Sequence, residues 1–207
     1  HRGKEIMNTR IITISREFGS GGRTVGKIVA ERLGIACYDK ELVAKIAKES
    51  GLAEQFIQEN GEYAESANAF LFNWALGTGL DGGVLPISDQ LYIIQHNIIR
   101  NLAEKESCVI VGRCADYILR ERTDCLNTFI HASMEFRIRQ ITQHYGETPA
   151  KPEKFLRDRD KKRQNYYRHY TGRQWGVVQN YQLALESSAL GIEACADLIV
   201  KAAELLH

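Results

Sequence analysis

The 207-residue sequence lacks a long hydrophobic run and an excess of charge of either sign. No apolar stretch approaches the roughly 18 residues that a membrane-spanning helix needs, and no secretory leader is apparent. Basic and acidic residues number 27 and 26, so the chain as a whole has no electrostatic reason to bind nucleic acid or an anionic membrane. We therefore expect a soluble, cytoplasmic protein without membrane or nucleic-acid partners, in which any charged binding site is local.

Motifs for metal binding and for nucleophilic catalysis are missing as well. The five cysteines are odd in number and show no C-x-x-C spacing, so we expect reduced core residues and neither a zinc site nor a disulfide framework. The histidines show no metal-ligand spacing, and no G-x-S-x-G elbow is present. We therefore assign neither a zinc centre nor a serine triad.

The length of the chain suits one sizeable domain. Residues 1–6 precede Met7 and read as an upstream extension or a cloning remnant, which leaves residues 7–207 as a single domain. No internal repeat or low-complexity tract divides it further.

Short apolar runs alternate with helical patterns along this domain. The strand-like segments are residues 10–15, 35–38, 108–111, 125–131 and 181–185. Apolar residues recur at helical spacing over residues 24–33, 91–107 and 192–206. This alternation predicts an α/β fold with a mainly parallel sheet. The sequence GTGLDGG, residues 77–83, interrupts the helical pattern and is where an insertion or flap would sit.

The stretch ITISREFGSGGRTVGK, residues 12–27, joins a strand to a helix through a glycine-rich turn, as a phosphate-binding loop does. The full pattern G-x-x-x-x-G-K-[ST] is not met, because its first glycine falls on Glu17 and its lysine on Arg23. In that register Thr24 remains in place to contact Mg²⁺. The competing interpretation is a tight turn without a ligand. Arg23 favours a bound phosphate, because a cation is unfavourable at a helix N-terminus unless an anion sits there.

Two further residues follow strands at the predicted carboxyl edge of the sheet, where ligands bind in open α/β folds. Arg113 comes directly after a buried strand and is a second candidate for binding an anion; the alternative is a surface or salt-bridging arginine. Asp39 follows residues 35–38 and is either a helix N-cap or a carboxylate that contacts a ribose or a base. Arg137 could reach the same edge.

Residues 151–173 carry nine basic residues against three acidic ones, in a chain whose overall charges nearly balance. Such a segment can close over a polyphosphate and stabilise the charge that is transferred. Arg157, Arg159 and Arg163 fall within two helical turns, so several of them could converge on one ligand. A solvated helical face and a single-strand nucleic-acid patch with stacking tyrosines are the competing interpretations.

With these motifs in view, the chain after Met7 resembles the cytidylate kinase-like family, among the P-loop nucleoside monophosphate kinases. The resemblance is carried by ITISREFGSGGRTVGK, YDKELV, VIVGRCADYIL, RDRDKKR and YQLALESSALGIEACADLI. It implies a P-loop NTPase-type three-layer sandwich, an acceptor-binding helical insertion at about residues 40–101 and a basic lid at about residues 151–176. Aligned without gaps to cytidylate kinase, the chain departs from the pattern: the P-loop lysine falls on Gly22 and the first loop glycine on Arg16.

The resemblance also implies positions for the site residues. Around the donor phosphates it places Gly19, Ser20, Gly21, Gly22, Arg23 and Thr24. Asp39 and Arg113 would lie near the acceptor nucleotide, and the lid would contribute Arg157, Arg159 and Arg163. The catalytic cations would be Arg23 and the three lid arginines, and Thr24 would be the metal ligand.

The activity implied is ATP- and Mg²⁺-dependent phosphoryl transfer to a nucleoside monophosphate, with CMP or dCMP as the acceptor inherited from the family. Two alternatives remain open at this stage. One is a kinase of another small metabolite. The other is a nucleotide-binding regulatory protein with little catalysis, which the absence of the lysine favours and which Thr24 and the dense lid arginines disfavour.

Overall fold

The structure is a computed structural model that describes residues 10–39, 42 and 87–206. In chain order its elements are β1 (Ile11–Arg16), α1 (Gly22–Leu33), β2 (Ala36–Tyr38), α5 (Ile87–Lys105), β3 (Cys108–Val111), α6 (Ala115–Ile118), β4 (Cys125–His131), α7 (Met134–Gln143), α8 (Pro152–Thr171), the 3-10 turn η1 (Val178–Asn180), β5 (Leu183–Glu186), α9 (Ser187–Leu190) and α10 (Ile192–Leu205).

The strands form one five-stranded sheet in the order β2-β3-β1-β4-β5, and every pair is parallel. The central strand is β1, whose Ile11 is in register with Cys108 of β3 and with Cys125 of β4. All six residues of β1 are buried, as expected of a parallel strand covered on both faces. The carboxyl ends of the strands therefore meet at one edge, where the loops that follow β1 and β3 lie side by side.

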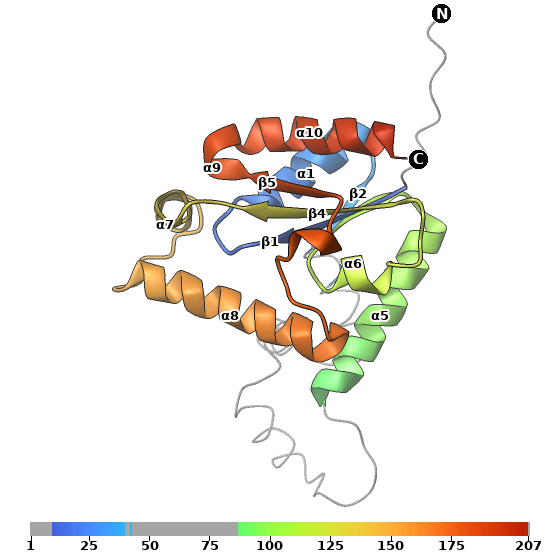
Figure 1. The fold of residues 1–207 in the computed structure, drawn as a ribbon, viewed down its shortest axis with the longest axis horizontal. Coiled ribbons are helices and arrows are strands. Elements are labelled where there is room, and N and C mark those ends of the chain that lie inside the picture. The colour runs from blue at the N-terminus through green and yellow to red at the C-terminus, as the bar shows by residue number, and fades with distance from the viewer. Residues whose placement is uncertain (1–9, 40–41, 43–86, 207) are drawn as a thin grey trace, which may run out of the picture.

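Helices cover both faces of the sheet and give three layers (Figure 1). Alternate residues of β1 divide between the two cores: Ile12 packs in a cluster with α1 and α10, whereas Ile11 packs in a cluster with α5, α6 and α8. This division follows from the period of two in a strand, which sends successive side chains to opposite faces. The helix α8 lies on the face opposite α10 and runs beneath the carboxyl end of β1.

Local signals in the sequence set the ends of several helices. Gly34 ends α1 with a φ of +64° and donates its amide hydrogen to the backbone oxygens of Ala30 and Glu31. Pro152 begins the long helix α8, and Gly172, with a φ of +69°, ends it. Ser133 caps α7 by accepting a hydrogen bond from the amide of Phe136 at 3.3 Å.

The α/β class and the three-layer arrangement predicted from the sequence are confirmed, and the basic segment forms the helix α8; its role as a lid stays a prediction. In the described part of the chain the sheet is wholly parallel, where the sequence predicted a mainly parallel one. The predicted extension at residues 1–6, the helix after Asp39 and the break at residues 77–83 lie outside the described residues. Among the described helices, none is both long and apolar enough to cross a membrane.

Candidate active site

The glycine-rich loop spans residues 17–21, between the end of β1 and the start of α1. Gly19 and Gly21 both have a φ of +80°, a conformation that side chains disfavour. A Cβ on Gly19 would also lie 2.9 Å from the backbone oxygen of Arg137, and one on Gly21 would lie 2.8 Å from Cδ1 of Ile192, the movable end of that side chain. Gly19 is therefore required by both its backbone conformation and its packing, and Gly21 chiefly by its backbone conformation.

The N-terminus of α1 faces this loop without an anionic partner from its own helix. Its N-cap, Gly21, provides no side-chain hydrogen bond, and the first turn contains no acidic residue. The first turn instead carries Arg23 and Thr24, both exposed. Because the end of a helix concentrates positive potential and unsatisfied amide hydrogens, this arrangement favours binding of an anion such as a phosphate.

A buried cluster of ion pairs anchors the glycine-rich loop to α7 and α8. Asp160 of α8 accepts a hydrogen bond from the amide of Phe18 at 2.8 Å and forms an ion pair with Arg137 of α7. Arg137 also donates from Nε to the backbone oxygen of Phe18 at 2.7 Å and lies 3.4 Å from the carboxylate of Glu17. Arg137 reaches the carboxyl edge as anticipated, but there it anchors the loop. No sequence motif indicated the pairing with Asp160.

Ser20 is wholly buried and its polar groups are used inside the protein. Its hydroxyl donates to the backbone oxygen of Glu17 at 2.9 Å. Its backbone oxygen accepts from the hydroxyl of Ser187, at the start of α9, at 2.6 Å. Ser20 therefore shapes the loop from within, while its neighbours Gly21 and Gly22 present backbone at the helix start.

Arg23 and Asp39, placed by sequence in the donor and acceptor sites, form an ion pair in the structure. Asp39 is 7% exposed and lies just past the end of β2, whereas the side chain of Arg23 is 49% exposed. The pair brings the first turn of α1 close to the end of β2.

Three buried arginines line one cavity at the carboxyl ends of β1 and β3. Arg16, Arg113 and Arg163 are 7%, 8% and 9% exposed. The described residues of its lining are Ser15, Arg16, Gly112, Arg113, Cys114, Arg163, Tyr166, Tyr167 and Trp175. None of these described residues is acidic, and three fixed positive charges converge among them. Arg163 reaches across from α8 and donates from a terminal nitrogen to the backbone oxygen of Arg16 at 2.9 Å.

The backbone at Arg113 is held in an uncommon conformation. Gly112, Arg113 and Cys114 follow one another with φ values of +74°, +64° and +55°. For the two residues with side chains this conformation costs on the order of 1–3 kcal/mol each and persists only where the surroundings impose it. Gln95 of α5 supports it by donating a hydrogen bond to the backbone oxygen of Arg113 at 3.0 Å. Strained residues of this kind cluster at active sites and ligand-binding loops, which makes Arg113 a candidate site residue.

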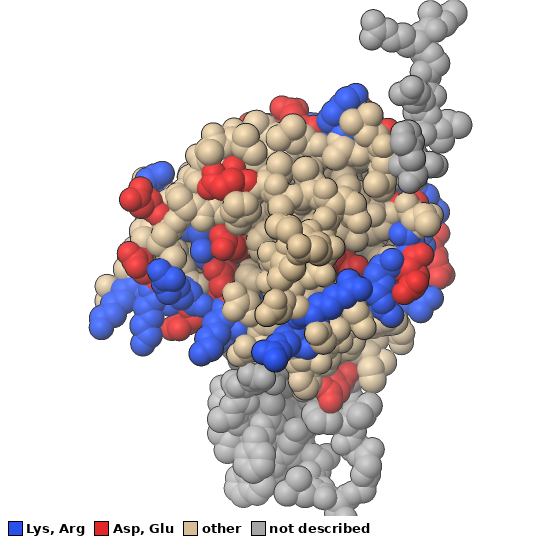
Figure 2. Space-filling view, viewed as in Figure 1, with Lys and Arg blue, Asp and Glu red and all other residues tan. Residues whose placement is uncertain are grey.

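The three arginines of α8 that the sequence assigned to a lid occupy different environments. Arg163 lines the cavity, and its guanidinium lies 5.2 Å from the centre of the Phe18 ring. Arg159 lies beside it, 5.4 Å from the same ring and 4.9 Å from that of Phe155. Arg157 is exposed. In Figure 2, basic side chains gather along the edge of the molecule that α8 forms. The structure thus brings Arg159 and Arg163 to the loop and leaves Arg157 at the surface.

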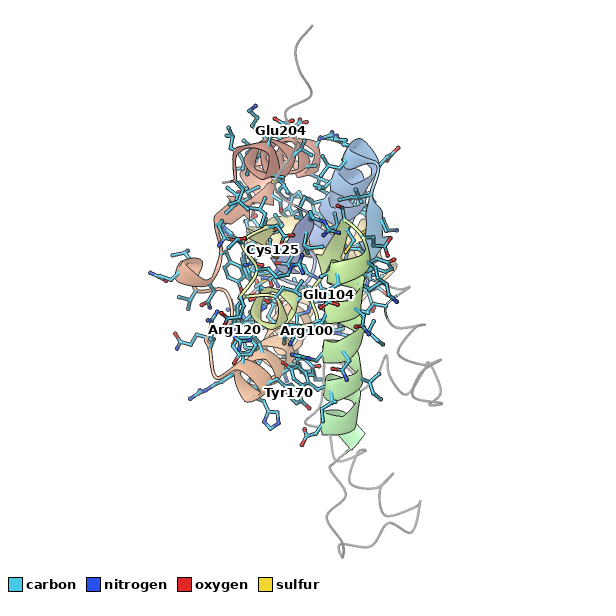
Figure 3. The ribbon with its side chains drawn as sticks, turned by 90° about the vertical axis from the view of Figure 1, so that its right-hand side faces the viewer. Arg100, Glu104, Arg120, Cys125, Tyr170 and Glu204 are labelled. Carbon is cyan, nitrogen blue, oxygen red and sulfur yellow. The ribbon has the colours of Figure 1, made fainter. Side chains whose placement is uncertain are left out.

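Tyrosines join α8 to the helices behind the cavity. Tyr167 donates a hydrogen bond to Asp116 of α6 at 2.6 Å, and burial raises the pKa of the Asp116 carboxyl above its ordinary 3.8. Tyr170 stacks on Tyr92 of α5 with ring centres 4.1 Å apart. Figure 3 shows Tyr170 beside this helix. These contacts hold the part of α8 that carries Arg163, and Tyr167 also lines the cavity.

Within the described ranges, no group of three or more histidine, cysteine, aspartate or glutamate side chains could hold a metal ion. Mg²⁺ commonly binds through one or two protein oxygens together with the phosphates of its substrate. The exposed hydroxyl of Thr24 at the start of α1 fits that mode.

Comparisons with known proteins agree with this geometry. The sequence model of the cytidylate kinase-like family matches residues 11–189. A cytidylate kinase from Archaeoglobus fulgidus is 28% identical over 200 residues, which cover 94% of each chain. The crystal structure of an uncharacterized protein from Eubacterium ventriosum has a TM-score of 0.70 at 28% identity, over 93% of this chain and 97% of that one. Shikimate kinase from Acinetobacter baumannii has a similar fold, with a TM-score of 0.55 at 15% identity over 95% and 93% of the two chains.

Proposed function

Because the chain belongs to the cytidylate kinase-like family, we propose that it transfers the γ-phosphoryl group of ATP to a nucleoside monophosphate, with CMP or dCMP as the favoured acceptor. The family supports the broader class, a kinase of a nucleotide or small metabolite. The observation that carries the proposal is the cluster of Arg16, Arg113 and Arg163 beside the uncapped N-terminus of α1. Phosphoryl transfer needs alignment and neutralisation of charge above all, and this arrangement supplies both.

In the proposed complex the donor phosphates lie against the glycine-rich loop. The backbone of Gly19, Gly21 and Gly22 would approach the phosphate oxygens closely, with Ser20 shaping the loop beneath them. Thr24 would hold Mg²⁺ together with those phosphates, and the ion would supply positive charge to the β- and γ-phosphates. Arg23 would contribute to the donor site after leaving Asp39.

The acceptor would lie at the carboxyl ends of β2 and β3. Arg113, which lines the cavity from the strained turn after β3, would bind the acceptor phosphate with two hydrogen bonds from its planar guanidinium. Asp39, at the end of β2, would contact the ribose or the base once Arg23 releases it. This placement leaves the two phosphates on either side of Arg16.

The lid helix would stabilise the negative charge on the γ-phosphoryl group during its transfer. Arg163 already reaches the cavity, Arg159 lies on the same side of α8, and Arg157 would join them if the lid closes further on the donor. An oxygen of the acceptor phosphate is itself the nucleophile and is ionised at neutral pH, so the reaction needs no strong general base. Tyr166 and Trp175 in the wall would limit access of water to the transferring group.

The decisive experiment measures ADP formation by the purified protein with ATP and Mg²⁺, with CMP, dCMP, UMP, AMP, GMP or no acceptor, and separates the nucleotide products by chromatography. We expect ADP and the matching diphosphate in equal amounts with CMP or dCMP. ATP binding without transfer to any of these acceptors would contradict the proposal and would favour a different metabolite or a regulatory nucleotide-binding role.

The role of Arg113 is tested in the same assay. Arg113→Ala is expected to raise the KM for the acceptor by on the order of 10²-fold, because a bidentate contact to phosphate is lost, and to leave the KM for ATP nearly unchanged. An equal rise in both KM values would show that Arg113 does not act on the acceptor alone.

A further inference from the structure

At two positions, one on each side of the loop, the residue types are the reverse of those in the P-loop pattern. That pattern places a glycine six residues before its lysine. In the register that aligns the chain with cytidylate kinase, these two positions are Arg16 and Gly22. The backbone agrees with this register, because Gly21 has the positive φ of a required glycine and α1 begins at Gly22. The basic side chain therefore stands at the opposite end of the loop from the expected lysine.

Side chains at positions 16 and 22 would compete for the same space. A Cβ built on Gly22 would lie 2.6 Å from Cβ and 2.9 Å from Cγ of Arg16. Both atoms belong to the stem of Arg16, next to the backbone of β1, so they cannot swing away as the tip of a long side chain would. The loop accommodates one side chain in this space, and here it comes from Arg16.

The stem of Arg16 packs against the first residue of α1, and the side chain lines the cavity together with Arg113. Arg16 thus spans from the proposed donor site to the proposed acceptor site. Its backbone is fixed on both sides, since it pairs with Ile130 of β4 and accepts the hydrogen bond from Arg163. Arg23, the other residue aligned with the lysine, is half-exposed and held by Asp39 at the end of β2.

We infer that Arg16 contacts the β- and γ-phosphates of the donor in place of the P-loop lysine, an inference that rests on the proposed function for the identity of the donor. The guanidinium grips two oxygens at once and keeps its charge throughout. During transfer the acceptor oxygen forms a bond to the γ-phosphorus, and the bond from that phosphorus to the β-γ bridging oxygen breaks. Arg16 neutralises the charge that builds up on the bridging and γ-oxygens, and it neither gains nor loses a proton.

The test restores the standard pattern by exchanging the two residues. Arg16→Gly alone is expected to weaken ATP binding by at least about tenfold and to lower kcat/KM by on the order of 10²-fold. The double variant Arg16→Gly with Gly22→Lys should recover most of both losses, because the lysine then enters the space that Arg16 has left. Arg139→Ala, an exposed basic residue on α7, serves as the control and should match the unaltered protein.

ATP affinity is measured by titration calorimetry, turnover by product chromatography and folding by thermal unfolding. Arg16→Gln, which keeps most of the stem, replaces Arg16→Gly if the glycine variant does not fold. ATP affinity within about twofold of the unaltered protein in a folded Arg16 variant overturns the inference, as does an unaltered protein that does not bind ATP. If the unaltered protein binds ATP but phosphorylates no acceptor, the proposed function fails, whereas a loss of affinity restored by the double variant still establishes Arg16 as the phosphate ligand.

Discussion

Gly19 and Gly34 show at the scale of single residues how the same residue type meets different demands. Both have positive φ, of +80° and +64°. A Cβ on Gly34 would meet nothing within 4 Å, whereas one on Gly19 would meet the backbone oxygen of Arg137 at 2.9 Å. Gly34 is thus required by the conformation of a helix end alone, and Gly19 by conformation and by the close approach of α7.

This difference predicts unequal costs for two matched substitutions. Gly34→Ala should lower the free energy of unfolding by about 1 kcal/mol, the strain of a side chain at positive φ. Gly19→Ala should lower it by about 3 kcal/mol, because the overlap with the backbone adds to that strain. Urea denaturation of both variants measures the difference. Equal losses would show that α7 can move away from the loop.

The buried carboxyl of Asp116 predicts a dependence of stability on pH. Burial raises its pKa above the ordinary 3.8, so the folded protein keeps this proton at pH values where the unfolded chain has released it. The contribution of Asp116 to the free energy of unfolding therefore falls as pH rises above 3.8, until the carboxyl of the folded protein also ionises.

Asp116→Asn removes that titration while keeping an oxygen to accept from Tyr167. Thermal unfolding of both proteins from about pH 4 to about pH 7 should show the stability difference shifting in favour of Asp116→Asn as pH rises. A difference that stays constant over this range would mean that Asp116 titrates alike in the folded and unfolded chains.

Where a motif fixes their place in the chain, the sequence predicts the position of candidate residues in the fold, while their roles stay predictions. Gly19, Gly21 and Gly22 were identified from the loop pattern, and Arg113 from its place after a buried strand. The partners that these residues find were not predictable, because Asp160 and Arg137 are 23 residues apart and meet only once α8 has packed on α7. The ion pair of Arg23 with Asp39 was missed for the same reason.

At the scale of elements, α8 both packs over the glycine-rich loop and fixes its backbone. Its Asp160 holds the amide of Phe18, and its Arg163 holds the backbone oxygen of Arg16, so the helix clamps both ends of the turn that follows β1. The periodicity of the sequence identified this helix and its charge. The periodicity did not show that one of the three acidic residues of α8 faces inward. An acidic residue within a basic segment is expected on a solvent-exposed face of the helix.

Removal of this acid tests the clamp. Asp160→Ala leaves Arg137 buried without its main anionic partner, so the free energy of unfolding should fall by about 3 kcal/mol. The matched control is Asp158→Ala, an exposed acid on the same helix, which should change it by less than about 0.5 kcal/mol. Equal, small effects in urea denaturation would show that the cluster does not hold the loop.

At the scale of the whole molecule, the distribution of thiols reports on the integrity of the fold. All five cysteines are free, four are buried and Cys37 is half-buried. Burial raises the pKa of the Cys125 thiol to about 12 and also raises that of Cys195, so these groups carry little of the reactive thiolate at neutral pH.

A chromogenic thiol reagent at about pH 8 should therefore modify one cysteine quickly in the folded protein and the other four only as the protein unfolds. Cys37→Ser should remove the fast phase and leave the slow one. A fast phase of several thiols would show that the two cores open locally without global unfolding.

The central position of β1 in the sheet has a consequence for how the chain folds during its synthesis. Its neighbours are made much later, since Thr13 bonds to Asn127 across 114 positions of sequence. During synthesis on the ribosome, the apolar segment of β1 therefore has no partner strand until more than half of the chain has emerged. Closing such distant pairs slows folding and leaves the strand open to wrong partners, so we expect chaperones to engage the nascent chain before β4 is complete.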